Sequence, residues 1–296
     1  MRIVLSRKGF DSAAGGGPSP VLEDGTMLSL PIPEFAGKGH VPKNLDTAGW
    51  HKYDDLNLLP EIITYCKEKG TSEFCHLDPD IRPDLWYHCE KWQPTFGQCN
   101  AAGGHLKNQL DLNNIEQENI LFLFFGLFRH WTNNKFTSKP FHAVWGYMVC
   151  DEVIEKQHNM PPYHPHRKLK KAPNDSNDFN NLLFIAKDEC YGTFKFCEEL
   201  VLTDLEAIPY AKTKWKIAAL PWFEYLKDKS VTMTYHNSEK SFPADKNYFQ
   251  TCQGYGQEFV VSPGVADNPE LNWKNCSFSQ ILSNLKEMYP EKENNQ

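Results

Sequence analysis

ILFLFFGLF at residues 120–128 and FHAVWGYMVCDEVI at residues 141–154 are the two stretches that decide the fold. Both are nearly continuous apolar runs, a pattern typical of β-strands buried on both faces. The second run is long enough to need a bend, and Gly146 is where we expect it. Shorter strands are predicted at residues 3–5, 182–186 and 193–203. A large buried sheet is therefore the predicted centre of the molecule.

Helices are expected around this sheet. Residues 54–69 place their apolar side chains on one helical face, with Pro60 suited to the first turn and Gly70 placed to end the helix. A closing helix is predicted at residues 277–289, where an S-x-x-Q capping box precedes an apolar face. The helices are few and lie far apart in the sequence, so they are expected to pack at the periphery.

Together these elements predict an α+β protein. We expect one domain over residues 1–296, built on a curved, mostly antiparallel sheet or a partial β-barrel with peripheral helices. The Asp24-Gly25 pair between two short apolar runs predicts a hairpin turn, because glycine tolerates the positive φ of a tight turn. Residues 157–178 hold several prolines, a basic cluster and a polar run, which predicts an exposed insertion.

The overall composition fits one large folded chain of 296 residues, with 40% hydrophobic and 23% charged side chains. Its 20 prolines and 18 glycines argue against a helical bundle or coiled coil. The net charge of −7 excludes a protein that coats nucleic acid through its total charge, so such contact needs a local patch. The concentrated basic patch is Arg167, Lys168, Lys170 and Lys171, suited to a nucleic-acid backbone or to a solvated insertion tip.

The cellular location follows from what the sequence lacks. The most apolar run, residues 120–128, is about half as long as a bilayer helix. The first residues lack the apolar core and cleavage site of a secretory signal. We therefore expect a cytoplasmic protein whose nine cysteines are free thiols. Residues 75–105 hold three cysteines and three histidines, but their spacing matches no zinc pattern, so neither a bound metal nor a disulfide is predicted.

The first candidate site follows the N-terminal strand. Arg7 and Lys8 are two cations that could hold a phosphate, and Asp11 stands beside them as an acid or base. Ser12 adds a hydroxyl group, and Gly16 lies in a glycine run whose backbone amides can approach a ligand. The alternative is structural: Arg7 and Asp11 would form an ion pair that fixes the hairpin. The motif is not a Walker loop, because it lacks GK[ST].

Two further candidate stretches lie between residues 76 and 106. In HLDPD, residues 76–80, Asp78 stands beside a histidine and could act in acid/base chemistry, or it could simply cap a turn. In TFGQCNAAGGHL, residues 95–106, Phe96 offers a stacking face and Gln98 a carboxamide that can hydrogen-bond a base edge. His105 is a possible general base, or a histidine satisfied in the interior.

A weaker fourth candidate is CQGYGQEFVV, residues 252–261. Its residues Gly256, Gln257 and Glu258 precede an apolar strand. They are interpreted either as a second wall of the same site or merely as the entrance to that strand.

These stretches occur in an order that resembles a known family. SRKGFDSAAGGGPSP, DGTMLSLPIP, HLDPD, FGQCNAAGGHL, LFLFFGLFR and HAVWGYMVCDEVI resemble the nucleotide modification associated domain 3 family over nearly the whole chain. The resemblance implies a place in bacterial or phage pathways that install or process modified DNA bases, without a settled reaction or cofactor. The two apolar strands also look like the central strands of barrels related to PUA and EVE domains, which bind modified bases.

The leading hypothesis is an enzyme that modifies a nucleotide or a DNA base. A non-catalytic reader of modified bases and a scaffold in a phage defence or counter-defence system are the alternatives. The proposed partner is a nucleotide or a modified base, with DNA also meeting the basic patch. The residues proposed for catalysis are Asp11, Asp78 and His105, and those for binding are Arg7, Lys8, Ser12, Gly16, Phe96 and Gln98.

Overall fold

A computed structural model describes residues 2–11, 14–33, 50–70, 72–86, 91–112, 120–168, 180–204, 212–213, 249–251 and 258–261. The predicted helix at residues 277–289 lies outside these ranges, as do Ser12, Lys170 and Lys171. Of the predicted insertion at residues 157–178, the first twelve residues are described.

A nine-stranded sheet forms the centre of the molecule, with the path β13-β14-β1-β7-β9-β10-β6. Neighbours along the path are antiparallel, except that β1 and β7 run parallel; β2 and β8 also pair with β7. The strands are β1 (Arg2–Arg7), β2 (Ser19–Val21), β6 (Thr95–Gln98), β7 (Ile120–Thr132), β8 (Lys135–Phe136), β9 (Phe141–Ile154), β10 (Leu182–Thr193), β13 (Phe249–Thr251) and β14 (Glu258–Val261). The predicted α+β class with a mostly antiparallel sheet is confirmed, and the sheet does not close into a barrel over the residues described.

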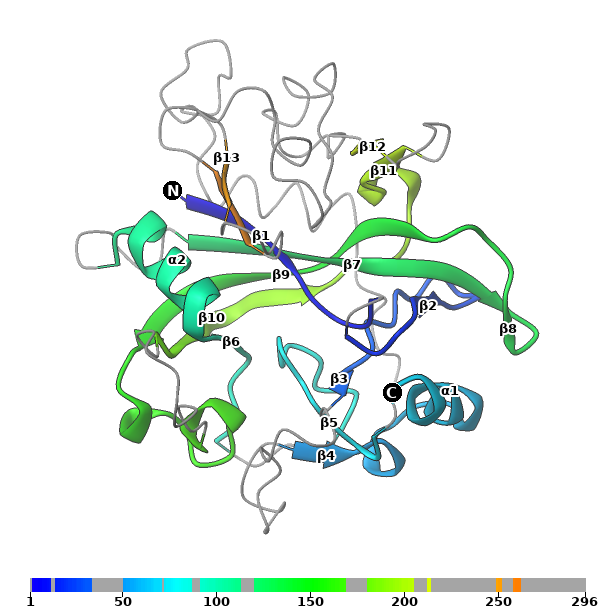
Figure 1. The fold of residues 1–296 in the computed structure, drawn as a ribbon, viewed down its shortest axis with the longest axis horizontal. Coiled ribbons are helices and arrows are strands. Elements are labelled where there is room, and N and C mark those ends of the chain that lie inside the picture. Colours follow the sequence, from blue (N-terminus) through cyan, green and yellow to red (C-terminus); the bar gives the residue numbers. More distant parts are fainter. Residues whose placement is uncertain are drawn as a thin grey trace.

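The two apolar runs are the long central strands. β7 and β9 pair with each other and cross the molecule beside β10, as Figure 1 shows. Residues 120–126 of β7 are all buried, and the strand becomes partly exposed towards its end. The pairing slips between Phe124 and Phe125, opposite Gly146, which confirms the predicted bend. A second slip occurs between β9 and β10. These irregularities curve the sheet.

A second, smaller layer lies below the large sheet in Figure 1. Its sheet has the order β3-β5-β4, formed by β3 (Ile32–Pro33), β5 (Phe74–His76) and β4 (Trp50–Lys52). Helix α1 (Pro60–Gly70) packs beside it and buries Ile62 and Cys66. The helix begins at Pro60 and not at residue 54, because Tyr53–Asp55 form a separate 3-10 turn. Pro60 is thus the first helical residue, where its missing N–H costs nothing.

The predicted turn at Asp24-Gly25 is present, whereas the last predicted strand is wrong and one helix was not predicted. Leu22 N donates to Thr26 O (2.9 Å), and Gly25 has φ 83°, so the predicted turn is present. The predicted strand at residues 193–203 is wrong: β10 ends at Thr193, and a 3-10 turn (Glu198–Leu200) precedes β11 (Thr203–Asp204), which pairs with β12 (Lys212–Thr213). The sequence did not predict helix α2 (Asn100–Leu110), which lies against the end of the large sheet.

The segment after β9 turns back toward the interior. Two 3-10 turns, Gln157–Asn159 and Pro165–Lys168, follow the strand. Met160, His164 and His166 have almost no exposed surface, whereas His158, Asn159 and Pro162 are exposed, so the described part of the expected insertion is packed against the protein through some of its residues.

Candidate functional site

Four polar side chains from distant parts of the chain meet in the interior: Lys8, Asp78, Gln98 and Glu258, which we call the Lys8 cluster. Lys8 comes directly after β1, where its backbone N–H donates to Phe125 O of β7 (2.8 Å). Gly126 permits this approach, since a Cβ there would lie 2.6 Å from the carbonyl oxygen of Lys8. The curvature of the sheet brings Gln98 of β6 against Glu258 of β14, although these strands lie far apart in the sheet.

The ammonium group of Lys8 lies between two carboxylates. Its Nζ is 3.3 Å from Asp78 Oδ2 and 3.7 Å from Glu258 Oε1. All three side chains are at least nine-tenths buried. Two buried carboxylates with one cation leave excess negative charge whenever both are ionised, so the two carboxyl groups are expected to differ in protonation.

Asp78 is the carboxylate that stays ionised. Burial alone would raise its pKa, but the charge of Lys8 and the backbone N–H of Gly97 lower it. The Gly97 N–H donates to Asp78 Oδ1 (2.9 Å), so both oxygens of this carboxylate have donors.

Glu258 is the carboxyl group that holds a proton more readily. Burial raises its pKa to about 7, although Lys8, Gln98 and Ser6 favour the ionised form. Oε1 accepts two hydrogen bonds, from Ser6 Oγ (3.1 Å) and Gln98 Nε2 (2.5 Å), and the ammonium of Lys8 lies 3.7 Å from the same oxygen. Its other oxygen, Oε2, is buried and receives no hydrogen bond from any described residue. A proton on Glu258 therefore belongs on Oε2.

Three neutral histidines flank the Lys8 cluster. Burial lowers the pKa of His76 to about 4 and also lowers the pKa of His164 and of His166. His166 Nδ1 lies 2.6 Å from Asn181 Oδ1, and its Nε2 lies against Gly97, where a Cβ would come within 2.5 Å. His164 Nδ1 accepts a hydrogen bond from the backbone N–H of His166 (3.2 Å). Over the described ranges, no group of three or more His, Cys, Asp or Glu side chains is arranged to hold a metal ion.

Asp80 adds a second protonatable carboxyl group nearby. Burial raises its pKa to about 7, although the hydrogen bond from the indole of Trp92 favours the ionised form. Trp92 Nε1 donates to Asp80 Oδ2 at 2.7 Å. Asp80 pairs through its backbone with Thr95, so it is fixed beside β6 and two residues from Asp78.

Phe96 packs against the ammonium group of the cluster. Its ring is fully buried among Phe122, Phe124 and Phe184, and the Nζ atom of Lys8 lies 4.4 Å from its centroid. A cation over an aromatic face is attracted by the ring's quadrupole, which helps to hold the ammonium in place. The predicted role of Phe96 in stacking on a base stays a prediction, and the ring has no exposed surface here.

Arg7 and Asp11 form a separate pair. Arg7 Nη2 lies 3.1 Å from Asp11 Oδ2, and Asp11 Oδ1 accepts from Ala14 N (2.7 Å). Burial lowers the pKa of Arg7 to about 10, and both side chains are about nine-tenths buried. The neighbouring His142 has its pKa lowered to about 4, first by burial and then by Arg7. This is the ion pair that the structural interpretation of the sequence anticipated.

The other predicted site residues lie elsewhere. Gly16 is exposed, and His105 is half-buried on α2. Arg167 donates to the backbone carbonyl oxygens of His158 (2.8 Å) and Met160, so its guanidinium is engaged with its own segment.

The sequence pointed to several of these residues. Lys8, Asp78, Phe96 and Gln98 were predicted site residues, and Glu258 was interpreted either as part of a second wall or as the entrance to a strand; the structure brings these five together. Ser6, His164 and His166 were not predicted. The sequence around them gave little indication of a site, because a serine within a strand and an HPH triplet beside lysines are both typical of solvent-exposed positions.

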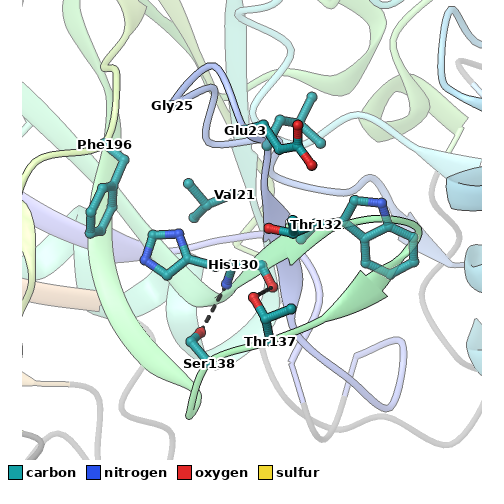
Figure 2. A pocket seen from close by; sticks show the side chains of 10 residues that line it. Val21, Glu23, Gly25, His130, Thr132, Thr137, Ser138 and Phe196 are labelled. Atoms are coloured by element: carbon teal, nitrogen blue, oxygen red, sulfur yellow. Dashed lines mark hydrogen bonds between the residues drawn. The ribbon is translucent and has the colours of Figure 1, made fainter.

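A hollow of about 440 Å³ lies further along β7, away from the Lys8 cluster. Figure 2 shows it between the Asp24-Gly25 turn, the β7–β8 hairpin and Phe196. The His130 ring packs edge-on against Phe196 (4.7 Å between centroids), and His130 N donates to Ser138 Oγ (2.9 Å). Thr137 donates to the carbonyl oxygen of His130. These polar groups are paired with one another, and the hollow contains none of the predicted site residues.

Comparison with known proteins identifies the family. The model of the family described as nucleotide modification associated domain 3 matches residues 2–262, most of the chain and all the elements of the Lys8 cluster. The chain belongs to this family. The resemblance inferred from the sequence is thus confirmed, and the family description associates the chain with nucleotide modification. Neither a curated protein nor a solved structure matches it. Within the described part, no helix has the length and apolar character needed to span a membrane.

Proposed function

We propose that this protein is an enzyme that modifies the base of a nucleotide or of DNA, with Glu258 as its general acid or base. Oε2 of Glu258 is buried and has no donor among the described residues, while Oε1 has two donors and an ion pair with Lys8. An unpaired oxygen on a buried carboxyl group costs about 1–3 kcal/mol unless a ligand completes it. The hydrogen bonds that hold Oε1 would orient Oε2 toward a substrate.

The two carboxyl groups of the cluster have different roles. Asp78 remains ionised and holds Lys8, while Glu258 changes protonation near neutral pH because its pKa is raised to about 7. Two titratable groups whose environments push their pKa values apart are the usual arrangement for assigning acid and base roles. Oε2 would take a proton from a ring or amino nitrogen of the base, or return one. Glu258 has no exposed surface, so the site is closed as described, and substrate entry requires it to open.

Lys8 is better suited to tuning Glu258 than to holding phosphate. Its charge is already compensated by two carboxylates, and Arg7 is compensated by Asp11. A phosphate would be a third anion beside Lys8 and would be repelled at short range. We therefore assign Lys8 to the carboxyl groups, and Phe96 and Gln98 to the support of Lys8 and Glu258. Catalysis by Asp11 or His105 stays a prediction.

Family membership supports the setting of the reaction. We place it in a bacterial or phage base-modification pathway in the cytoplasm, as the sequence suggested. A convergent acid/base pair favours an enzyme over a reader of modified bases, which would need an aromatic cage but no such pair. No cofactor is assigned.

Nucleoside mass spectrometry tests the proposal. DNA, RNA and the free nucleotide pool would be digested from cells that produce the wild type, Glu258→Gln or Glu152→Gln, the last being the same change at an exposed site on β9. We expect an altered nucleoside with the wild type and Glu152→Gln, and a loss of roughly 10²- to 10⁴-fold with Glu258→Gln. Unchanged nucleosides, with a wild type that merely binds a modified base, would support a reader.

A further inference from the structure

The geometry of Glu258 also limits which bases can complete the site. Oε1 accepts hydrogen bonds from Ser6 and Gln98 and faces the ammonium of Lys8 at 3.7 Å, so the oxygen left for a ligand is Oε2. A carboxylate oxygen accepts hydrogen bonds and cannot donate them when ionised. The missing partner of the ionised group is therefore a hydrogen-bond donor.

The net charge of the cluster also favours a hydrogen-bond donor as the ligand of Oε2. Lys8 supplies one positive charge against the two carboxylates of Asp78 and Glu258, and the flanking histidines are neutral near neutral pH because their pKa values are lowered. An anion or a carbonyl oxygen would place electron density against Oε2, which is unfavourable in a buried site. A polarised N–H group places positive charge there.

Among groups on a nucleobase, the exocyclic amino group fits this requirement. Cytosine and adenine present an amino donor at the position where uracil and hypoxanthine present a keto acceptor. We infer that the site selects amino bases over their keto counterparts, with Oε2 of Glu258 accepting a hydrogen bond from the amino group. This inference rests on the proposed function, because it names the substrate class of the same site.

A single substitution reverses the chemistry at that atom. In Glu258→Gln, the carbonyl oxygen of the new amide must occupy the place of Oε1, because two donors and the ammonium of Lys8 face that position. The amide NH₂ group then takes the place of Oε2 and turns an acceptor into a donor. The variant should therefore prefer a keto base, whereas a side chain that is merely structural would change no preference.

The experiment is calorimetric binding of two matched pairs, cytidine with uridine and adenosine with inosine, to the full chain at a pH well above the pKa of Glu258. We expect the wild type and Glu152→Gln to bind the amino member of one pair about 10- to 100-fold more tightly, because the keto member in the same pose places an acceptor opposite Oε2 and must shift to offer its ring N–H instead. Glu258→Gln should lose this preference or reverse it. If this variant does not fold, the preference of the wild type alone still decides.

Equal binding of both members by the wild type, or an amino preference retained in folded Glu258→Gln, would overturn the inference. Binding of none of the four nucleosides would overturn it as well. The nucleoside composition of producing cells separates this failure from that of the proposed function. If composition still depends on Glu258, the modification assignment stands and the amino-base assignment falls; if it does not, both fall.

Discussion

Arg7 and Lys8 are adjacent cations, yet they occupy two different kinds of buried environment. Arg7 pairs with Asp11, four residues further along the chain. Lys8 pairs with Asp78, 70 residues away, and with Glu258 of β14, the strand that neighbours β1 on the side away from β7. One pair closes a local loop, and the other joins three distant segments. The Lys8 contacts, unlike the Arg7 pair, bring functional groups from distant parts of the sequence into one site.

The partners of the two cations also differ in how well they are satisfied. Both oxygens of Asp11 have a partner: Oδ2 lies 3.1 Å from Arg7 Nη2, and Oδ1 accepts from Ala14 N. Glu258 accepts two hydrogen bonds at Oε1, which also faces Lys8, and none from the described residues at Oε2. A satisfied buried carboxylate needs no ligand to explain it, whereas a half-satisfied one does. This contrast separates a structural ion pair from a candidate active site.

Replacing Lys8 with Met should give the largest effect on stability. The change leaves the buried carboxyl groups of Asp78 and Glu258 without their cation. Removing one partner of a buried ionic group is expected to lower the free energy of unfolding by about 3–5 kcal/mol. Chemical denaturation followed by circular dichroism measures this loss.

Lys67→Met is the matched control for Lys8→Met. Lys67 pairs with Asp54 at the surface, with side chains 35% and 59% exposed. Its loss should cost less than about 1 kcal/mol. Equal effects of the two substitutions would contradict the view that Lys8 lies at the centre of a buried cluster.

Glu258→Gln should change how stability depends on pH. The pKa of Glu258 is raised from 4.5 to about 7 in the folded protein, so the folded state binds this proton more tightly than the unfolded state. Between these values the group's contribution to stability falls as pH rises. The wild type should therefore lose stability relative to Glu258→Gln between pH 4.5 and about 7, with a constant difference outside that window.

Denaturation curves of both proteins over a series of pH values check this. Asp80, whose pKa is also raised to about 7, is present in both and cancels in the difference. The histidines with lowered pKa values and Asp78 cancel in the same way to first order. A difference that stays constant between pH 4.5 and about 7 would show instead that Glu258 is ionised in both states throughout this window.

The sequence predicted well what local pattern determines. The apolar runs became β7 and β9, Gly146 lies opposite the bend, and Asp24-Gly25 forms its turn. These features depend on residues that are neighbours in the chain, so a short window of sequence contains the cause.

The candidate site was predicted only in part. Lys8, Asp78, Phe96 and Gln98 were proposed as members of one site, and they do meet. The sequence could not rank Glu258 above Asp11, because the pairing of Gln98 with Glu258 depends on how the sheet curves. The burial of His164 and His166 likewise depends on contacts with residues that are distant in sequence, such as Gly97.

Gly97→Ala should have a smaller effect than Lys8→Met, and it should act at the histidine side of the cluster. A Cβ at residue 97 would lie 2.5 Å from His166 Nε2, so the imidazole must shift. Overpacking of this kind costs about 1–3 kcal/mol of the free energy of unfolding.

Thermal unfolding measures this cost. Gly97→Ala should be less damaging when it is added to His166→Ala than when it is added to the wild type, because the smaller side chain leaves room for the new methyl group. No loss of stability in Gly97→Ala alone would show that His166 is not packed against β6.

Asp11→Asn should have the smallest effect on modification, and it decides between the two interpretations of the N-terminal loop. Asn keeps an oxygen for Ala14 N but loses the charge that faces Arg7. We expect about 1–2 kcal/mol less stability, from a weakened charged hydrogen bond. Nucleoside modification, measured by mass spectrometry, should stay within about twofold of wild type after correction for the folded fraction. If Asp11 is instead the catalytic acid or base, the loss should be roughly 10²- to 10⁴-fold with little change in unfolding. That second outcome, together with activity retained in Glu258→Gln, would move the active site from the Lys8 cluster to the Arg7 pair.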